Sequence, residues 1–109
     1  MNTFKKLKQY PLSIPLLEKW MENFYVESNR KTIITNEFLV DFLDSKGIYI
    51  EISVKCALDN SIWFTPDVFF INMGIDREIY FREYKSRLEA TEVAIDKAFY
   101  LLEQKLKIN

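Results

Sequence analysis

The feature that most constrains the fold is a change in hydrophobic period directly after Gly47. The segment "IYIEISVKC" (48–56) alternates apolar and polar side chains without a break. A period of two predicts a β-strand with one buried face and one solvated face. The residues expected to point into the core are Ile48, Ile50, Ile52, Val54 and Cys56. Cys56 is therefore predicted to be a small core residue rather than a reactive thiol.

Two further extended segments are expected after this strand. "LDNS" (58–61) has the composition of a tight turn, and "IWFTPDVFFIN" (62–72) predicts a second strand. Pro66 cannot donate a ladder hydrogen bond, so we expect either a bulge there or a strand that begins only at Asp67. A turn at "MGIDR" (73–77) then leads into "EIYFREY" (78–84), which predicts a third strand.

The chain before Gly47 has the spacing of helices. Apolar residues recur on one wide face between about residues 14 and 26, with Ser13 as a candidate cap. "NEFLVDFLDSKG" (36–47) predicts a second helix that is capped by Asn36 and stopped by Gly47. The lysine-containing stretch 1–12 is expected to be a loosely held basic arm.

A long helix is expected at the end of the sequence. "SRLE" (86–89) has the capping-box pattern, with Ser86 as the cap, and the helix should continue to about residue 105. Ala90, Ala94 and Ala98 follow one another at one-turn spacing. Small side chains along one ridge allow a helix backbone to lie close to its neighbour, and the upstream strands make a sheet the simplest neighbour.

These elements predict an α+β protein, with a three-stranded antiparallel sheet packed by two N-terminal helices and one long C-terminal helix. The 109 residues are expected to form a single domain. Its parts are the arm (1–12), the two helices (13–47), the strands (48–84) and the last helix (86–106).

The sequence lacks the residues that most enzymes use. It has no histidine, a single cysteine and two isolated glycines, Gly47 and Gly74. These numbers exclude Ser-His or Cys-His nucleophile pairs, Cys/His zinc sites and glycine-rich phosphate loops. The carboxylate pairs Asp41/Asp44 and Asp59/Asp67 do not have the spacing of a calcium loop. We therefore expect no enzyme, no cofactor and no metal.

Binding is the better-supported class of function, because aromatic residues make up 16% of the chain. Aromatic and arginine side chains dominate the energetics of protein interfaces. The candidate partner-binding residues are Tyr49, Trp63, Tyr80, Arg82 and Tyr84; the candidate phosphate contacts are Lys5, Lys6, Lys8, Arg30, Lys31 and Arg87. The net charge of −1 gives no overall basic excess for nucleic acid. The longest apolar run is too short for a membrane span, and the lone cysteine fits a reducing cytoplasm.

The order of the elements resembles the double-stranded-RNA-binding domain. A helix, three antiparallel strands and an alanine-bearing helix follow one another over about residues 37–106. That resemblance implies contacts to RNA phosphates at the start of the last helix, where this chain has "SRLEATE" and Arg87.

A second resemblance covers most of the chain. "LLEKWMEN" (16–23), "GIYIEISV" (47–54) and "YKSRLEATEVAIDKAFYLLEQKL" (84–106) are similar to small uncharacterised proteins of Bacteroidota phages and prophages. The resemblance implies an accessory protein made in the host cytoplasm, such as an anti-CRISPR-like inhibitor that binds a host defence nuclease or its guide-RNA complex. An RNA-binding module and a homodimeric structural or assembly protein of the phage are the alternatives.

Overall fold

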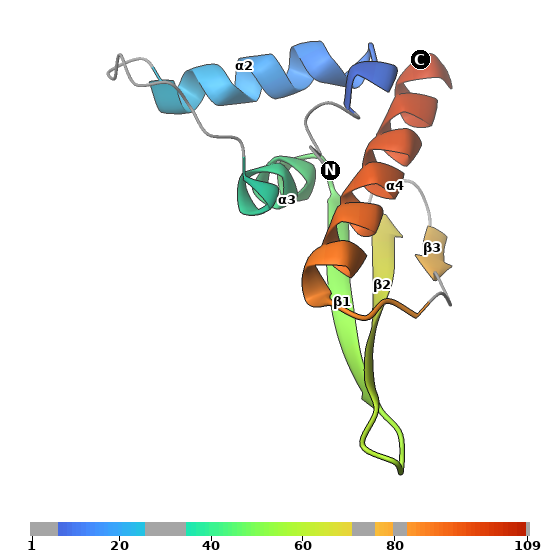
Figure 1. Ribbon diagram of the computed structural model, residues 1–109. Coiled ribbons are helices and arrows are strands. Elements are labelled where there is room, and N and C mark those ends of the chain that lie inside the picture. Colours follow the sequence, from blue (N-terminus) through green and yellow to red (C-terminus); the bar gives the residue numbers. More distant parts are fainter. Residues whose placement is uncertain (1–6, 26–34, 71–75, 80–82, 109) are drawn as a thin grey trace.

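The computed structural model describes residues 7–25, 35–70, 76–79 and 83–108 (Figure 1). The elements are the 3-10 helix η1 (Leu7–Gln9), α2 (Ser13–Tyr25), α3 (Asn36–Ser45), β1 (Ile48–Cys56), β2 (Ile62–Phe70), β3 (Asp76–Ile79) and α4 (Arg87–Ile108). The α4 helix packs against both β1 and β2, while α3 packs against β1 and α4. The predicted α+β class and the antiparallel pairing of the two long strands are confirmed.

The sheet is built on the β1–β2 hairpin. Its register is unbroken from Ile48 opposite Phe70 to Cys56 opposite Ile62. The short strand β3 pairs antiparallel with the end of β2, which gives the strand order β1-β2-β3. The sequence placed a third strand at 78–84, whereas β3 lies at Asp76–Ile79 and Tyr84 forms an isolated bridge with Phe64. Residues 80–82 lie outside the described residues.

Pro66 does not interrupt β2, so the predicted bulge or late start is wrong. Pro66 lies directly opposite Ile52 within the continuous ladder. The reason is the direction of its nitrogen. Both backbone hydrogen-bonding groups of Phe64 point away from β1, toward Tyr84, at 2.8 and 2.9 Å. Because these directions alternate along a strand, the Pro66 nitrogen also points away from β1 and its missing N–H removes no β1–β2 hydrogen bond.

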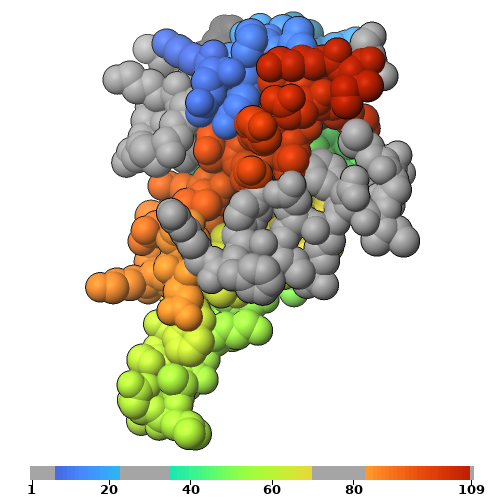
Figure 2. Space-filling model, turned by 90° about the vertical axis from the view of Figure 1, so that its right-hand side faces the viewer, coloured from blue at the N-terminus to red at the C-terminus, as the bar shows by residue number. Residues whose placement is uncertain are grey.

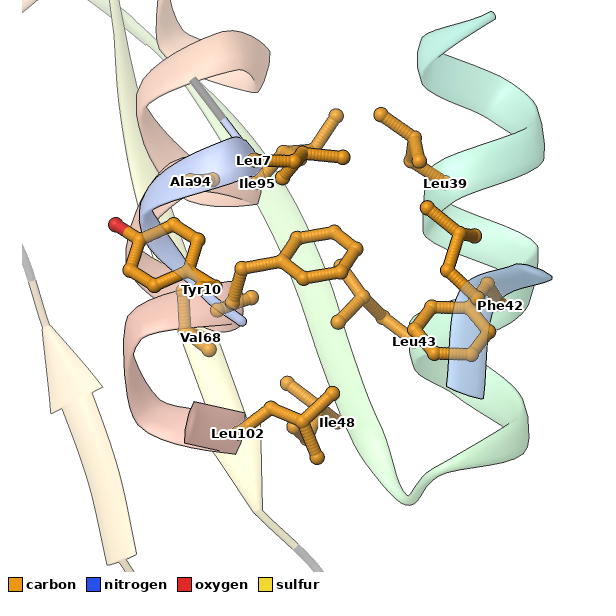
Figure 3. Close-up of a cluster of buried hydrophobic side chains, with 13 residues drawn as sticks. Leu7, Tyr10, Leu39, Phe42, Leu43, Ile48, Val68, Ala94, Ile95 and Leu102 are labelled. Atoms are coloured by element: carbon orange, nitrogen blue, oxygen red, sulfur yellow. The ribbon is translucent and has the colours of Figure 1, made fainter. Parts of the chain in front are cut away.

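The small ridge of α4 faces the sheet. Ala90, Ala94 and Ala98 are all fully buried, and Ala94 and Ala98 lie in the same hydrophobic cluster as Val68. Figure 3 shows how side chains from α3, α4, η1 and the sheet converge on this cluster. The predicted packing role of the alanines is confirmed, since the close approach of helix and sheet leaves no room for a larger side chain.

A row of aromatic rings connects the helices. Tyr10 stacks on Phe99 at a centroid distance of 6.4 Å, and Phe99 stacks on Phe42 at 5.7 Å. Trp20 then meets the Phe42 ring edge to face at 6.3 Å. Because Trp20 comes from α2, Phe42 from α3 and Phe99 from α4, the row holds these three helices and the segment after η1 in one core.

The expectation of a loose arm is wrong for residues 7–12. Leu7 is fully buried and Tyr10 nearly so, both within the main hydrophobic cluster. Hydrogen bonds from the Gln9 amide (3.2 Å) and the Tyr10 hydroxyl (2.9 Å) to the Asp96 carboxylate fasten this segment to α4. Only two residues, Leu7 and Tyr10, bind this segment to the core, and the lysines next to Leu7 made the segment look wholly polar in the sequence.

A buried carboxylate on α4 holds the start of α2. Glu103 is 2% exposed and accepts hydrogen bonds from the backbone N–H groups of Leu12 and Ser13 and from the Ser13 hydroxyl, at 2.9 to 3.1 Å. Unpaired N–H groups and the helix dipole make a helix N-terminus a favourable place for a carboxylate. Ser13, which was predicted to cap this helix, is instead its first residue and a donor to Glu103.

The other helix ends follow local rules. Thr35, rather than the predicted Asn36, caps α3 by accepting a hydrogen bond from the Phe38 N–H at 3.1 Å. Gly47 ends α3 with a φ of 77°, a conformation that suits glycine. Ser86 caps α4 as predicted, since its hydroxyl accepts from the Glu89 N–H at 3.1 Å. Helix α4 extends to Ile108, slightly beyond the expected end.

We predict that Glu103→Gln lowers the free energy of unfolding by about 1–3 kcal/mol, because one carboxylate oxygen is replaced by an NH₂ group that faces N–H donors. Chemical denaturation measures the change. Glu89→Gln, an exposed glutamate of the same helix, serves as the matched control and should change stability by less than about 0.5 kcal/mol. Equal effects of the two substitutions would contradict the role of Glu103.

The Tyr10 phenol should make stability depend on alkaline pH. Burial, and then the hydrogen bond to Asp96, raise the pKa of Tyr10 well above its ordinary value. An unfolded tyrosine ionises near about pH 10. The folded pKa is the higher one, so the stabilisation is complete below about pH 10 and is lost as the pH rises toward the folded pKa. Tyr10→Phe should therefore cost about 1 kcal/mol at neutral pH. In urea unfolding, the difference in free energy of unfolding between wild type and Tyr10→Phe should become smaller above about pH 10. A difference that does not change with pH would contradict this role of Tyr10.

Candidate interaction site

The far end of the β1–β2 hairpin extends beyond the helix that covers the rest of the sheet. The α4 helix begins at Arg87, whose guanidinium lies 5.2 Å from the centre of the Phe64 ring. Figures 1 and 2 show the hairpin end standing clear of the helices. The radius of gyration is 15.3 Å, against about 13 Å expected for a compact chain of this length.

Exposure along β1 follows from this geometry. Ile48 is buried and Ile50 is half-buried, whereas Val54 is 50% exposed and Cys56 is also exposed. The prediction that Val54 and Cys56 are core residues is therefore wrong. They lie on the same face as Ile48, as the alternation requires, but α4 does not reach far enough to cover them.

The hairpin loop is locally well defined. A turn closes with a hydrogen bond from the Asn60 N–H to the Ala57 carbonyl (3.0 Å), and Asn60 adopts a φ of 68°. The Asp59 carboxylate accepts hydrogen bonds from the Ser61 hydroxyl (2.7 Å) and N–H (3.0 Å), and these bonds lower the pKa of Asp59. A turn followed by a residue with positive φ is a standard three-residue hairpin connection. The loop thus presents its side chains on a fixed backbone.

Exposed apolar side chains gather at this end of the molecule. Leu58 at the loop is fully exposed, and Ile62, the first residue of β2, is 57% exposed. Leu88 in the first turn of α4 is 62% exposed and directly follows Arg87. We call Val54, Leu58, Ile62 and Leu88 the distal patch. Large apolar groups exposed together in this way are typical of a binding surface.

The predicted partner-binding residues that the structure describes do not form one surface. Strand pairing places Tyr49 and Trp63 on the face of the sheet opposite α4, because each lies between residues that face the helix. Tyr84 is bridged to Phe64 and so belongs to the α4 side. Tyr49 is exposed, while Trp63 and Tyr84 are half-buried. Tyr80 and Arg82 lie outside the described residues.

The two predicted phosphate contacts that the structure describes, Lys8 and Arg87, are also far apart. Lys8 is exposed on η1, next to Gln9, which is bonded to Asp96. Arg87 lies at the start of α4, about 14 Å from Asp96 along the helix axis. Lys5, Lys6, Arg30 and Lys31 lie outside the described residues. The two described cations are thus not brought together.

Sequence reasoning missed Leu58, Ile62 and Leu88. Leu58 did carry a signal, since a leucine inside the turn segment "ALDNS" serves no purpose in turn formation. The exposure of Ile62 and Leu88 had no such signal, because it depends on where α4 begins relative to the hairpin.

The described residues contain no group of three or more His, Cys, Asp or Glu side chains that could hold a metal ion. Over the same residues, no helix is long and apolar enough to cross a membrane. Comparison of the chain with protein-family models, with curated protein sequences and with solved structures gave no match. Both resemblances drawn from the sequence therefore stay predictions.

The loop conformation can be tested at Asn60. Replacement by valine should destabilise the protein by about 1–2 kcal/mol, because a β-branched residue tolerates positive φ poorly. Replacement by glycine, which adopts positive φ freely, should leave stability within about 0.5 kcal/mol of wild type. Thermal and urea unfolding of both variants provide the measurement. A valine variant as stable as the glycine variant would show that the loop does not hold this conformation.

Proposed function

We propose that this chain is a non-enzymatic binding protein that engages a partner protein stoichiometrically through the distal patch. The observation that carries the proposal is the full exposure of Leu58 on a hairpin loop with a defined backbone. Ile62 and Leu88 add exposed apolar area at the same end. Burying such side chains against a partner yields free energy, and a preformed loop loses little entropy on binding.

The charges at this end favour a protein partner over nucleic acid. Exposed cations (Lys55, Lys85 and Arg87) and exposed anions (Asp59, Glu83 and Glu89) occur together there. A phosphate backbone requires a surplus of cations, whereas an interface with another protein uses both signs around an apolar centre. The patch and its rim have the second composition.

The identity of the partner is proposed from sequence similarity. The resemblance to small proteins of Bacteroidota phages supports a host defence nuclease, or its guide-RNA complex, as the target in the host cytoplasm. Binding without chemistry would suffice for such an inhibitor, because a bound protein blocks a nuclease simply by covering its surface.

RNA binding is the alternative function. The order α3–β1–β2–β3–α4, with both helices packed on the sheet, supports it, since this is the layout of the double-stranded-RNA-binding domain. Against it, Arg87 lies over the Phe64 ring and Glu89 shares the first turn of α4. A homodimeric structural or assembly protein of the phage is the third candidate.

A capture experiment distinguishes these functions. The tagged chain is incubated with lysate of a susceptible Bacteroidota host, with and without RNase, and bound proteins are identified by mass spectrometry. We expect a partner that survives RNase and is lost from the Leu58→Ser/Ile62→Ser variant. The control is Ile108→Ser, which removes another exposed apolar side chain (81% exposed) from the opposite end of α4 and should not affect capture.

Two outcomes would overturn the proposal. Loss of the partner on RNase treatment would point to RNA binding. Equal capture by the Leu58→Ser/Ile62→Ser variant would show that the distal patch is not the contact. Because both residues are exposed, the double variant should remain folded, which circular dichroism can verify.

A further inference from the structure

Strand β1 has a long edge that no strand of the described residues covers. The strand order β1-β2-β3 leaves one side of β1 without a neighbour. The strand contains no proline, glycine or bulge, and its register with β2 is unbroken. Proteins normally protect such an edge, because its unpaired N–H and C=O groups form a template for another strand.

The hydrogen-bond pattern shows which residues offer these groups. The Ala57 N–H donates to the Ser61 carbonyl at 2.9 Å, so the backbone of Ala57 points toward β2. Directions alternate along a strand, and the odd-numbered residues of β1 therefore pair with β2. The residues whose backbone groups point outward from the edge are Ile48, Ile50, Ile52, Val54 and Cys56.

Two opposite charges lie on the solvated face of this strand. Glu51 and Lys55 are both exposed and are separated by Ser53. Across β2, Glu51 lies opposite Asp67, another acidic residue, and Lys55 lies opposite Trp63. Like charges directly opposite one another are unfavourable. Glu51 has this acidic neighbour on the β2 side, and a cation on the other side of Glu51, at the open edge of β1, would be favourable.

We propose that a second copy of this chain pairs with the β1 edge, antiparallel, around a two-fold axis at Ser53. Ile52 and Val54 then exchange backbone hydrogen bonds with Val54 and Ile52 of the second copy, which are residues with outward-pointing groups. In the same register, Glu51 of each copy lies opposite Lys55 of the other. The surface is self-complementary, as a two-fold interface requires.

Charge selects this register among those that the backbone allows. An axis at Glu51 or at Lys55 would place identical charges opposite one another. An axis at Ile52 or Val54 would leave Glu51 opposite Ser53 or Ala57. Only the Ser53 axis forms two Glu51–Lys55 pairs, and on the other face it sets the half-exposed Val54 beside Ile52 of the second copy.

The pairing leaves the distal patch largely accessible. It runs from Ile50 to Cys56 and stops before Ile48, the buried end of the strand that lies near α3. Ile62 lies on β2, away from the edge, and Leu88 lies on α4. Val54 is the one residue that both surfaces share, whereas Leu58, Ile62 and Leu88 of the distal patch take no part in the strand pairing. This inference does not depend on the proposed function.

Charge reversal tests the register. Wild type should form dimers in sedimentation equilibrium, and Glu51→Lys or Lys55→Glu alone should each weaken self-association about tenfold or more, because two pairs per dimer become repulsive. An equimolar mixture of the two variants should regain the wild-type affinity as a heterodimer, because every pair is again of opposite sign. Both residues are exposed, so the folded state of each variant should be unaffected.

A wild-type protein that is monomeric at all concentrations would overturn the proposal. So would a dimer whose affinity does not respond to these substitutions, or variants that fail to rescue one another.

Cross-linking gives a second readout. In a Cys56→Ser background, Ser53→Cys should form a disulfide between two copies under mild oxidation, since the Cα atoms of a non-hydrogen-bonded pair lie about 4.5 Å apart. The control Thr65→Cys, opposite Ser53 on β2, should not.

Discussion

The close packing of α4 on the sheet determines which surfaces the protein presents. Fully buried alanines bring the helix backbone against β1 and β2, and the contact of Arg87 with Phe64 fixes the point on the hairpin where the helix begins. From there the helix runs away from the loop, so it covers the Ile48 end of the strand and leaves the Cys56 end bare. The projecting hairpin, the distal patch and the open edge of β1 all follow from this placement.

Contacts from the N-terminal part of the chain secure that arrangement. Glu103 and Asp96, both on α4, accept hydrogen bonds from the start of α2 and from the segment after η1. The row of rings from Tyr10 to Trp20 fills the space between these elements and α3. Because the hydrogen bonds to Asp96 and Glu103 join residues about ninety positions apart, the two ends of the described chain stabilise one core, and the hairpin end is left out of it.

Local patterns in the sequence predicted most of the elements, and long-range contacts account for most of the errors. The alternation at 48–56 predicted the correct strand and its two faces. It could not show that α4 begins too far from the hairpin loop to cover Val54. Ser86 and Gly47 were correctly assigned because the caps at these two helix ends involve only neighbouring residues. The burial of Leu7 and the capping of α2 by Glu103 had no local signal. For the candidate site, residue type alone selected Tyr49, Trp63 and Tyr84, and the structure distributes them over two faces of the sheet.

The exposure of the hairpin end is the central claim, and the single cysteine offers the most direct test of it. The reaction rate of the Cys56 thiol with a disulfide reagent should be measured on the native protein in dilute solution and again in denaturant. The structure predicts a native rate close to that of the unfolded chain, because Cys56 is exposed beyond the reach of α4. A native thiol that reacts only when the protein unfolds would mean that the hairpin end is buried, and it would contradict both proposed interaction surfaces.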